Sequence, residues 1–215
     1  MSVSRRRSFR TGAAAVIAVA ALAAGASAAN AGVLVASAPS CDDQSLAKTF
    51  LPWLDIADYT ALSGGDFESA SQSWSTNGPA SVVSDNESFR VGGSDDSQSL
   101  ALNNNSSATS PAICVGIEHP TLRFFAKRRS TGLLASLSTL NVQALIELAD
   151  GSVLPVPVGI VTNGGSWQPT LPMAIVANLL PLLPGEHTPV AFRFTAVGGD
   201  WSIDDVWVDP YGRKP

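Results

Sequence analysis

Two adjacent carboxylates near the end of the chain are the residues best placed to do chemistry. Asp204 and Asp205 lie inside the apolar run Trp201–Val208. Burying a carboxylate is costly unless it is paired or bound to a metal, so this pair predicts a bound hard cation. Asp66 and Glu68, at the start of the expected domain, are the other carboxylates that we expect to serve as ligands. The alternative is that Asp204 and Asp205 only accept hydrogen bonds from turns or backbone.

The N-terminus has the layout of a secretory signal. A basic stretch, Arg5–Arg10, precedes the alanine-rich run Gly12–Gly25, and small-x-small cleavage sequences end at Ala28 and Ala31. The run is shorter than the ~20 strongly apolar residues of a membrane-spanning helix. We predict a signal peptide over 1–31, a secreted, extracellular protein and no stable membrane insertion after cleavage. The paired arginines leave the export route open between Sec and twin-arginine.

Charge and composition narrow the class of protein. Removing the four arginines of the signal, which holds no acidic residue, moves the formal net charge from −5 to −9. A chain this acidic argues against nucleic acid and anionic membrane surfaces as partners, and we predict no nucleic-acid binding. Few charges, 18 Gly and 14 Pro favour an all-β protein. The length predicts one well-filled domain, and the oligomeric state stays open.

The two cysteines, Cys41 and Cys114, both lie in the exported part. In an oxidising compartment, a single pair predicts a disulfide. Neither cysteine has the basic neighbour that a catalytic thiol usually needs. We therefore expect a disulfide that staples the N-terminal arm, residues 32–63, onto the domain; the alternative is two free thiols.

Alternating apolar and polar residues predict strands from Gly64 onward. Residues 122, 124 and 126 share one face of a strand, and so do residues 140, 142, 144, 146 and 148. Asp150-Gly151 predicts a hairpin turn, and Pro155 and Pro157 confine the returning strand to an edge. Short strands separated by turn-rich segments are typical of a sandwich or a barrel.

The apolar segment Leu171–Leu183 is interrupted by three prolines and has no clear period. We expect it to cross the domain as buried chain. The alternative is an exposed patch that binds a partner, which is unusual on a soluble monomer.

Several short motifs occur in a familiar order: Gly65-Asp66-Phe67-Glu68, Trp74 with Gly78, Ser99–Leu102, Leu122–Lys127, Trp167, Val190–Phe194 and Trp201–Val206. In this order the chain resembles galactose-binding-like jelly-roll modules, especially the carbohydrate-binding modules of secreted bacterial glycoside hydrolases. The resemblance runs from about Gly64 to Asp209. It implies a jelly-roll β-sandwich of two antiparallel sheets over 64–210, followed by a short tail at 211–215.

The resemblance also implies a structural calcium ion. In such modules the first and last strands lie close together and often share Ca²⁺. Carried over, the ligands are Glu68 and Asp205 or Asp204, with Asp66 as a further candidate. Calcium takes six to eight oxygen ligands in flexible geometry. Because side chains alternate along a strand, we expect only one residue of the Asp204–Asp205 pair to be a ligand.

Ligand-binding residues are harder to predict. Arg123, Asn141, Gln143 and Glu147 lie on the polar faces of two expected strands. They are our candidates for a concave ligand surface; the alternative is a solvated face. Trp74, Trp167 and Trp201 match core positions, so no row of stacking rings remains. No nucleophile elbow, histidine-rich metal pattern or phosphate loop is present, and we predict no enzyme activity.

The sequence thus predicts a secreted, non-catalytic module that binds polysaccharide or cell-surface glycan. A stand-alone extracellular surface or matrix protein that mediates protein contacts is the alternative, and a small jelly-roll hydrolase is a distant third. The sequence does not identify the ligand.

Overall fold

The computed structural model describes residues 34, 44–69, 74–148, 150–162, 164–175 and 186–209. The chain divides into two units, Met1–Asn30 and Ala31–Pro215, and every described residue belongs to the second. The predicted signal peptide, Cys41, most of the segment Leu171–Leu183 and the tail 211–215 lie outside the described residues. Among the described helices, none is long and apolar enough to span a membrane.

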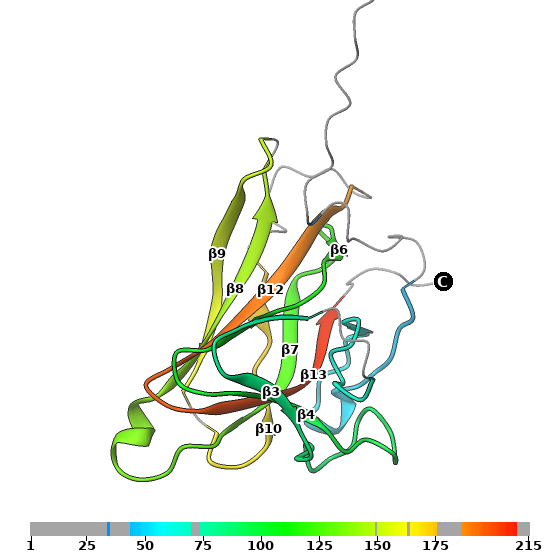
Figure 1. Cartoon of the computed structure of the whole chain (residues 1–215). Helices are drawn as coiled ribbons and strands as arrows, with labels where there is room; N and C mark the ends of the chain where they lie inside the picture. Colours follow the sequence, from blue (N-terminus) through cyan, green and yellow to red (C-terminus); the bar gives the residue numbers. More distant parts are fainter. Residues whose placement is uncertain are drawn as a thin grey trace, which may run out of the picture. The chain divides into compact units, whose positions relative to one another are not determined.

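Two antiparallel sheets form the described part of the chain (Figure 1). The first, the β13 sheet, has the order β10 (Gln168–Pro169), β7 (Thr121–Arg128), β13 (Trp201–Asp209), β4 (Ser99–Leu102), β3 (Ala80–Val83), with β1 (Thr60–Ala61) on β13 and β11 (Met173–Ala174) on β7. The second, the β12 sheet, has the order β2 (Ser75–Asn77), β5 (Ser107–Thr109), β12 (Thr188–Val197), β8 (Thr139–Glu147), β9 (Val153–Val161), with β6 (Ile113–Val115) on β12. Because the chain crosses repeatedly between the sheets, the expected jelly-roll β-sandwich is confirmed.

The core lies between the sheets and follows the predicted alternation. Leu122, Phe124 and Ala126 of β7 are buried in it, opposite the fully buried Phe192 and Phe194 of β12. Residues 140, 142, 144 and 146 of β8 join the same cluster. Full burial of a large apolar side chain stabilises by roughly 1.5–3 kcal/mol, so this two-residue period fixes which face of each strand points inward.

The described part of the expected arm packs on the outer face of the β13 sheet. Phe50 and Tyr59 form a buried cluster there with Phe125 of β7 and Trp167. The 3₁₀ helix η1 (Leu51–Trp53) is only one turn long and ends at Leu54, which has a positive φ of 62°. Pro52 lies at the start of η1, and proline is tolerated in the first turn of a helix but not in its interior.

The β8–β9 hairpin confirms two predictions. Gly151 has φ +80° in the turn, which is the conformation that glycine adopts without strain. β9 pairs with β8 and lies at the end of its sheet. Pro155 and Pro157 are within β9, paired with Leu145 and Gln143.

The β7–β8 connection carries an apolar surface that the sequence pattern did not predict. It contains the 3₁₀ helix η2 (Leu134–Leu137). Leu133, Leu134 and Leu137 are 89%, 75% and 75% exposed. We call these three residues the leucine tip.

Candidate metal centre and ligand-binding surfaces

Asp204 and Asp205 lie on the same side of β13. Ile203 and Val206 on either side of them are both in the core cluster. The register with β7 shifts between Asp204 and Trp207, and Asp205 has φ +46°. This irregularity has the features of a β-bulge, which adds a residue to one strand. The expectation that alternation would separate the two carboxylates is therefore wrong, and both side chains are buried on the outer face of the sheet.

Three buried carboxylates converge beside this bulge. Oxygen atoms of Glu87, Asp96 and Asp205 all lie within 4.8 Å of one another. Among the described residues, neither oxygen of Asp96 nor Oδ2 of Asp205 accepts a hydrogen bond of normal geometry, although the Asn86 side chain lies near enough to Asp96 to lower its pKa. Buried polar atoms almost always have partners, and hard cations such as Ca²⁺ prefer clustered carboxylate oxygens. The residues present fit a calcium ion.

Backbone N–H groups hold this cluster in place. Glu87 Oε1 accepts a hydrogen bond from Val91 N at 2.6 Å, and Oε2 accepts one from Phe89 N. Asp204 Oδ2 accepts from Glu87 N at 3.0 Å, and Oδ1 accepts from Asp205 N at 2.9 Å. Asp204 therefore fastens the loop between β3 and β4 to β13, while Asp205 faces the other carboxylates.

Glu68 and Asp66 lie at the edge of the centre. Glu68 Oε1 accepts from Ser97 N at 2.7 Å and from Gln98 N, and its charge acts on the neighbouring Asp96. Asp66 is exposed, and its Oδ1 accepts from Glu68 N at 3.4 Å. The structure thus brings the four predicted carboxylates to one region. Of these four, only Asp205 belongs to the central triad of Glu87, Asp96 and Asp205.

The pKa values of Asp204, Asp205 and Asp96 are all raised, because burial and neighbouring negative charges disfavour the ionised carboxylates. Burial, together with the charge of Asp205, raises the pKa of Asp204 to about 9. Burial and the charges of Asp96 and Glu87 raise the pKa of Asp205 to about 8. Burial and the charges of Glu68 and Glu87 raise the pKa of Asp96 to about 6. Burial acts the same way on Glu68, but hydrogen bonds from Ser97 and Gln98 outweigh it and lower its pKa.

Sequence reasoning missed Glu87 and Asp96. Both lie in turn-rich stretches that looked like solvated loops, and they are buried only because the loop folds back onto β13. Gly92 is the one available hint, since a Cβ there would lie 3.1 Å from Asp96 Oδ2 and 3.2 Å from Asp205 Oδ1. A loop glycine next to acidic residues indicates that another group approaches the backbone closely, but the sequence does not identify that group.

The predicted ligand-binding residues do not form one surface. Arg123 is on the β13 sheet, 4% exposed, where Nε donates to Thr170 O at 2.9 Å and Nη1 donates to Asp55. Its guanidinium also lies 4.1 Å from the ring centre of Phe50. Because the arm covers it, Arg123 is part of the fold rather than of an open ligand surface, which corrects the sequence-based grouping.

Asn141, Gln143 and Glu147 lie on the outer face of β8 in the other sheet. Glu147 Oε2 accepts a hydrogen bond from Leu34 N at 2.9 Å, and Leu34 packs on Ala112, Leu145 and Ala191. Leu34 therefore covers that end of the face. Asn141 and Gln143 line an open hollow of about 330 Å³ together with Thr195.

Two rows of side chains cross the β12 sheet at this hollow, and we call them the polar face. Strand pairing places the following residues in register: Ser75, Thr109, Arg193, Gln143 and Pro157 in one row, and Asn77, Ser107, Thr195, Asn141 and Ile160 in the next. Their sequence neighbours Ala108, Phe192, Phe194 and Val142 are in the core, so both rows face outward.

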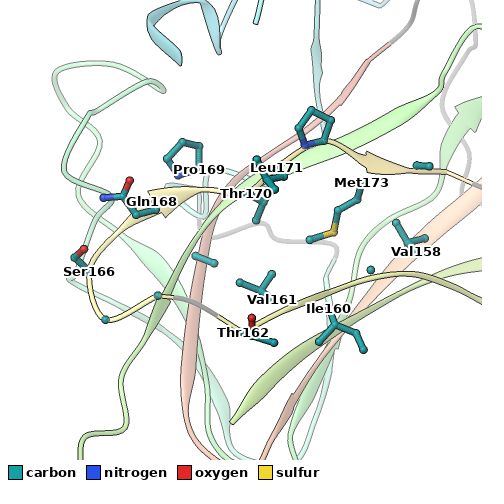
Figure 2. Close-up of a pocket in the computed structure, with 16 residues that line it drawn as sticks. Val158, Ile160, Val161, Thr162, Ser166, Gln168, Pro169, Thr170, Leu171 and Met173 are labelled. Carbon is teal, nitrogen blue, oxygen red and sulfur yellow. The ribbon is translucent and has the colours of Figure 1, made fainter. Parts of the chain in front are cut away.

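A larger hollow of about 550 Å³ lies between β9 and the β10–β11 segment (Figure 2). Val161 and Met173 point into it from opposite sides. Thr162, Ser166 and Gln168 are among its polar lining residues, and none of the described residues that line it is charged.

The two histidines meet on the β12 sheet although they are far apart in sequence. Pairing of Thr188 with Val115 brings His187 next to Glu118 and His119. His119 Nδ1 accepts from Gly116 N at 2.9 Å, and Nε2 lies 3.1 Å from Gln44 Oε1. Both ring nitrogens of His119 are thus engaged within the fold, which is typical of a structural histidine.

No protein-family model and no curated protein matches the chain. Among solved structures, the chain is similar to the CBM22-1 xylan-binding domain of Xyn10C from Paenibacillus barcinonensis, with 11% identity, TM-score 0.46, and coverage of 67% of this chain and 90% of that one. It is also similar to the C-terminal CBM6 of a laminarinase, LamC, from Zobellia galactanivorans (12% identity, TM-score 0.41, 70% and 98% coverage). A third is the enzymatically active domain of tailspike protein 4 from bacteriophage CBA120 (16%, 0.42, 69% and 21%). TM-scores below 0.5 assign no ligand, so function is argued from this chain's residues.

Proposed function

We propose that this chain is an exported, non-catalytic carbohydrate-binding module that binds polysaccharide or cell-surface glycan on the polar face. One observation carries the proposal: strand register places hydroxyl, amide and guanidinium groups side by side across four neighbouring strands of the β12 sheet, β2, β5, β12 and β8. A face that only contacts water does not require polar side chains in register beside a hollow. Sugar hydroxyls, in contrast, need hydrogen-bond donors and acceptors at fixed spacing.

The chemistry of the polar face suits a sugar ring. The side-chain amides of Asn141 and Gln143 each offer a donor and an acceptor, which matches neighbouring hydroxyls on a pyranose. Ile160, 63% exposed, and Pro157 lie beside them on β9 and supply apolar contact for the C–H face of the ring. The rows lie across a sheet rather than in a closed cavity, so a polymer can extend past both edges.

Glycan-array screening and affinity electrophoresis of the mature protein test this proposal. We expect binding to at least one polysaccharide, weakened by Asn141→Ala and Gln143→Ala. Since a hydrogen bond contributes about 0.5–1.5 kcal/mol net, each change should weaken binding by roughly three- to tenfold.

Ser81→Ala, at an exposed position on β3 of the other sheet, is the matched control and should bind normally. Thr162→Val in the larger hollow separates the two surfaces. Loss of binding in that variant, with normal binding by the Asn141 and Gln143 variants, would move the site to the larger hollow. Silence across plant, fungal and bacterial polysaccharides would overturn the proposal.

We also propose that the metal centre binds a structural calcium ion. Glu87, Asp96 and Asp205 would hold it, with Glu68 at the edge of the site. Calcium would neutralise the buried charge and tie the loop between β3 and β4 to β13. The two unpartnered oxygens of Asp96 support this assignment.

The leucine tip favours a second candidate function, a surface or matrix protein that mediates protein contacts. The sequence predicted buried chain in Leu171–Leu183 and gave an exposed patch there only as the alternative; of its described residues, Leu171 is 83% exposed and Ile175 is fully buried. The leucine tip has three exposed leucines within five residues of chain, whereas Leu171 is a single exposed leucine. Contiguous exposed apolar patches mark interaction sites.

A further inference from the structure

Arg193 lies in the middle of the polar face. It belongs to β12, the central strand of its sheet, and pairs with Thr109 on one side and Gln143 on the other. Its neighbours Phe192 and Phe194 are fully buried in the core, so the Arg193 side chain must leave the opposite face. The hollow lined by Asn141, Gln143 and Thr195 adjoins it.

The guanidinium of Arg193 has no carboxylate partner among the described residues. Lys48, Arg123 and Lys127 each form an ion pair with an aspartate. Arg90, Arg128 and Arg129 form no such pair among the described residues either, but none of them belongs to the rows of the polar face. Arg193 has only a long contact, from Nε to Thr109 Oγ1 at 3.4 Å. The chain has a formal net charge of −5, yet Arg193 has no acidic partner among the described residues. Most of its five N–H donors are therefore available to bind a ligand.

The charge around Arg193 is locally favourable for an anion. Neither row of the polar face contains an acidic residue, and Glu147, farther along β8, is bonded to Leu34 N. The carboxylates that make the protein acidic are concentrated elsewhere, notably in the metal centre on the other sheet. Guanidinium groups bind carboxylates through two parallel hydrogen bonds, and the neighbouring amides can bind the hydroxyls of the same ring.

We propose that the polar face selects acidic polysaccharides, with Arg193 binding the carboxylate of a uronic acid residue while Asn141, Gln143 and Thr195 bind adjacent hydroxyls. This inference rests on the proposed carbohydrate-binding function. It specifies the chemical class of the ligand and the residue that recognises its charge.

Polygalacturonate and its fully methyl-esterified form make a matched pair of probes, since they share a backbone and differ in charge. Alginate and its carboxyl-reduced form make a second pair. We expect the wild-type protein to bind each acidic polymer about tenfold or more tightly than its neutral counterpart, the scale of a charge-assisted hydrogen-bonded pair. The difference should shrink as NaCl is added.

Arg193→Gln should abolish the preference for the charged polymer, and Arg193→Lys should retain part of it, because lysine keeps the charge without the fork of donors. Arg129→Gln, which removes an exposed arginine that bonds Asn103, is the control and should behave as wild type. Thermal unfolding checks that each variant is folded.

Equal binding of charged and neutral polymers by the wild-type protein would overturn this inference and leave the proposed function standing. Binding to no polysaccharide at all would overturn the proposed function itself. If Arg193→Gln fails to fold, the comparison of charged and esterified polymers with wild-type protein still decides the question.

Discussion

Asp204 and Asp205 are consecutive residues whose carboxylates lie on the same outer side of β13, because the bulge shifts the register between Asp204 and Trp207. A regular strand would have sent one of them into the apolar core. The bulge therefore gathers negative charge beside Glu87 and Asp96, and the proposed calcium ion would compensate it.

The calcium-free protein should become less stable as the pH rises. The pKa values of Asp204 and Asp205 are raised to about 9 and about 8, above the unfolded value of about 3.9. A group whose pKa is raised by folding stabilises the folded state below its unfolded pKa and loses that contribution as pH rises through the folded pKa. We expect the free energy of unfolding of metal-stripped protein to fall between pH 5 and 9.

Saturating calcium should remove that decline, because the metal binds the ionised carboxylates. Thermal unfolding at pH 5, 7 and 9, with and without CaCl₂, measures the difference in midpoint. The difference should widen as the pH rises. A midpoint that calcium does not move at any of these values would exclude the calcium site.

Asp205→Asn should have opposite effects on the two forms. In metal-stripped protein it removes a buried charge that faces Asp96 and Glu87, so the unfolding midpoint should rise. In excess calcium it removes a ligand, so the midpoint should fall below that of wild type.

Asp95→Asn is the control for this experiment. Asp95 is exposed and precedes Asp96 in the same loop, so its loss changes the net charge equally without entering the centre. If both variants respond alike to calcium, Asp205 is not a ligand.

Arg123→Gln should destabilise the fold and leave glycan binding unchanged in the folded fraction. It removes the donor to Thr170 O and the ion pair with Asp55, and it leaves the half-buried Asp55 carboxylate without its cationic partner. Breaking a buried ion pair costs about 3–5 kcal/mol, and Asp55 is partly solvated, so we expect about 2–4 kcal/mol. Urea unfolding measures the loss in free energy of unfolding, with Arg129→Gln as control. A loss of glycan affinity without a loss of stability would show that Arg123 binds the ligand after all.

The leucine tip should drive association if the chain mediates protein contacts. Light scattering of the mature protein should then show concentration-dependent growth in mass, which Leu134→Ser abolishes. Leu171→Ser removes an exposed leucine elsewhere and should leave the association intact. A wild-type protein that stays monomeric at high concentration removes self-association as a role for the tip.

Reduction should lower the unfolding midpoint, because we predict a Cys41–Cys114 disulfide. Cys114 is buried in β6, and Gln44 Nε2 donates to its carbonyl at 3.4 Å, so Gln44, which is close to Cys41 in the sequence, lies beside β6. Closing a loop of this length stabilises by about 4 kcal/mol in the chain-entropy model. Cys41→Ala should match the effect of reduction. Alkylation of two thiols in unreduced protein would disprove the disulfide.

Period-two patterns predicted the strands well because burial on one face constrains every second residue. β7 and β8 follow the expected alternation through most of their length. Asp204 and Asp205 of β13 depart from such alternation, because a bulge there makes Val206, not Asp205, the next core residue after Ile203.

The candidate sites were harder to predict for the same reason. Asp66, Glu68, Asp204 and Asp205 were found because they flank recognisable strand motifs. Glu87 and Asp96 come together only through the course of a loop. Arg123 and Gln143 looked equivalent on alternating strands, but the sequence did not show that the arm would cover one sheet and leave part of the other open.

The prolines of β9 have a consequence for how the protein behaves at high concentration. The outer edge of β9 is the end of its sheet, and an extended segment from another molecule could in principle add to it. Pro155 and Pro157 supply no N–H group, so such a segment meets gaps in the ladder. The prolines of the β8–β9 hairpin thereby disfavour edge-to-edge aggregation of the sheet that carries the polar face.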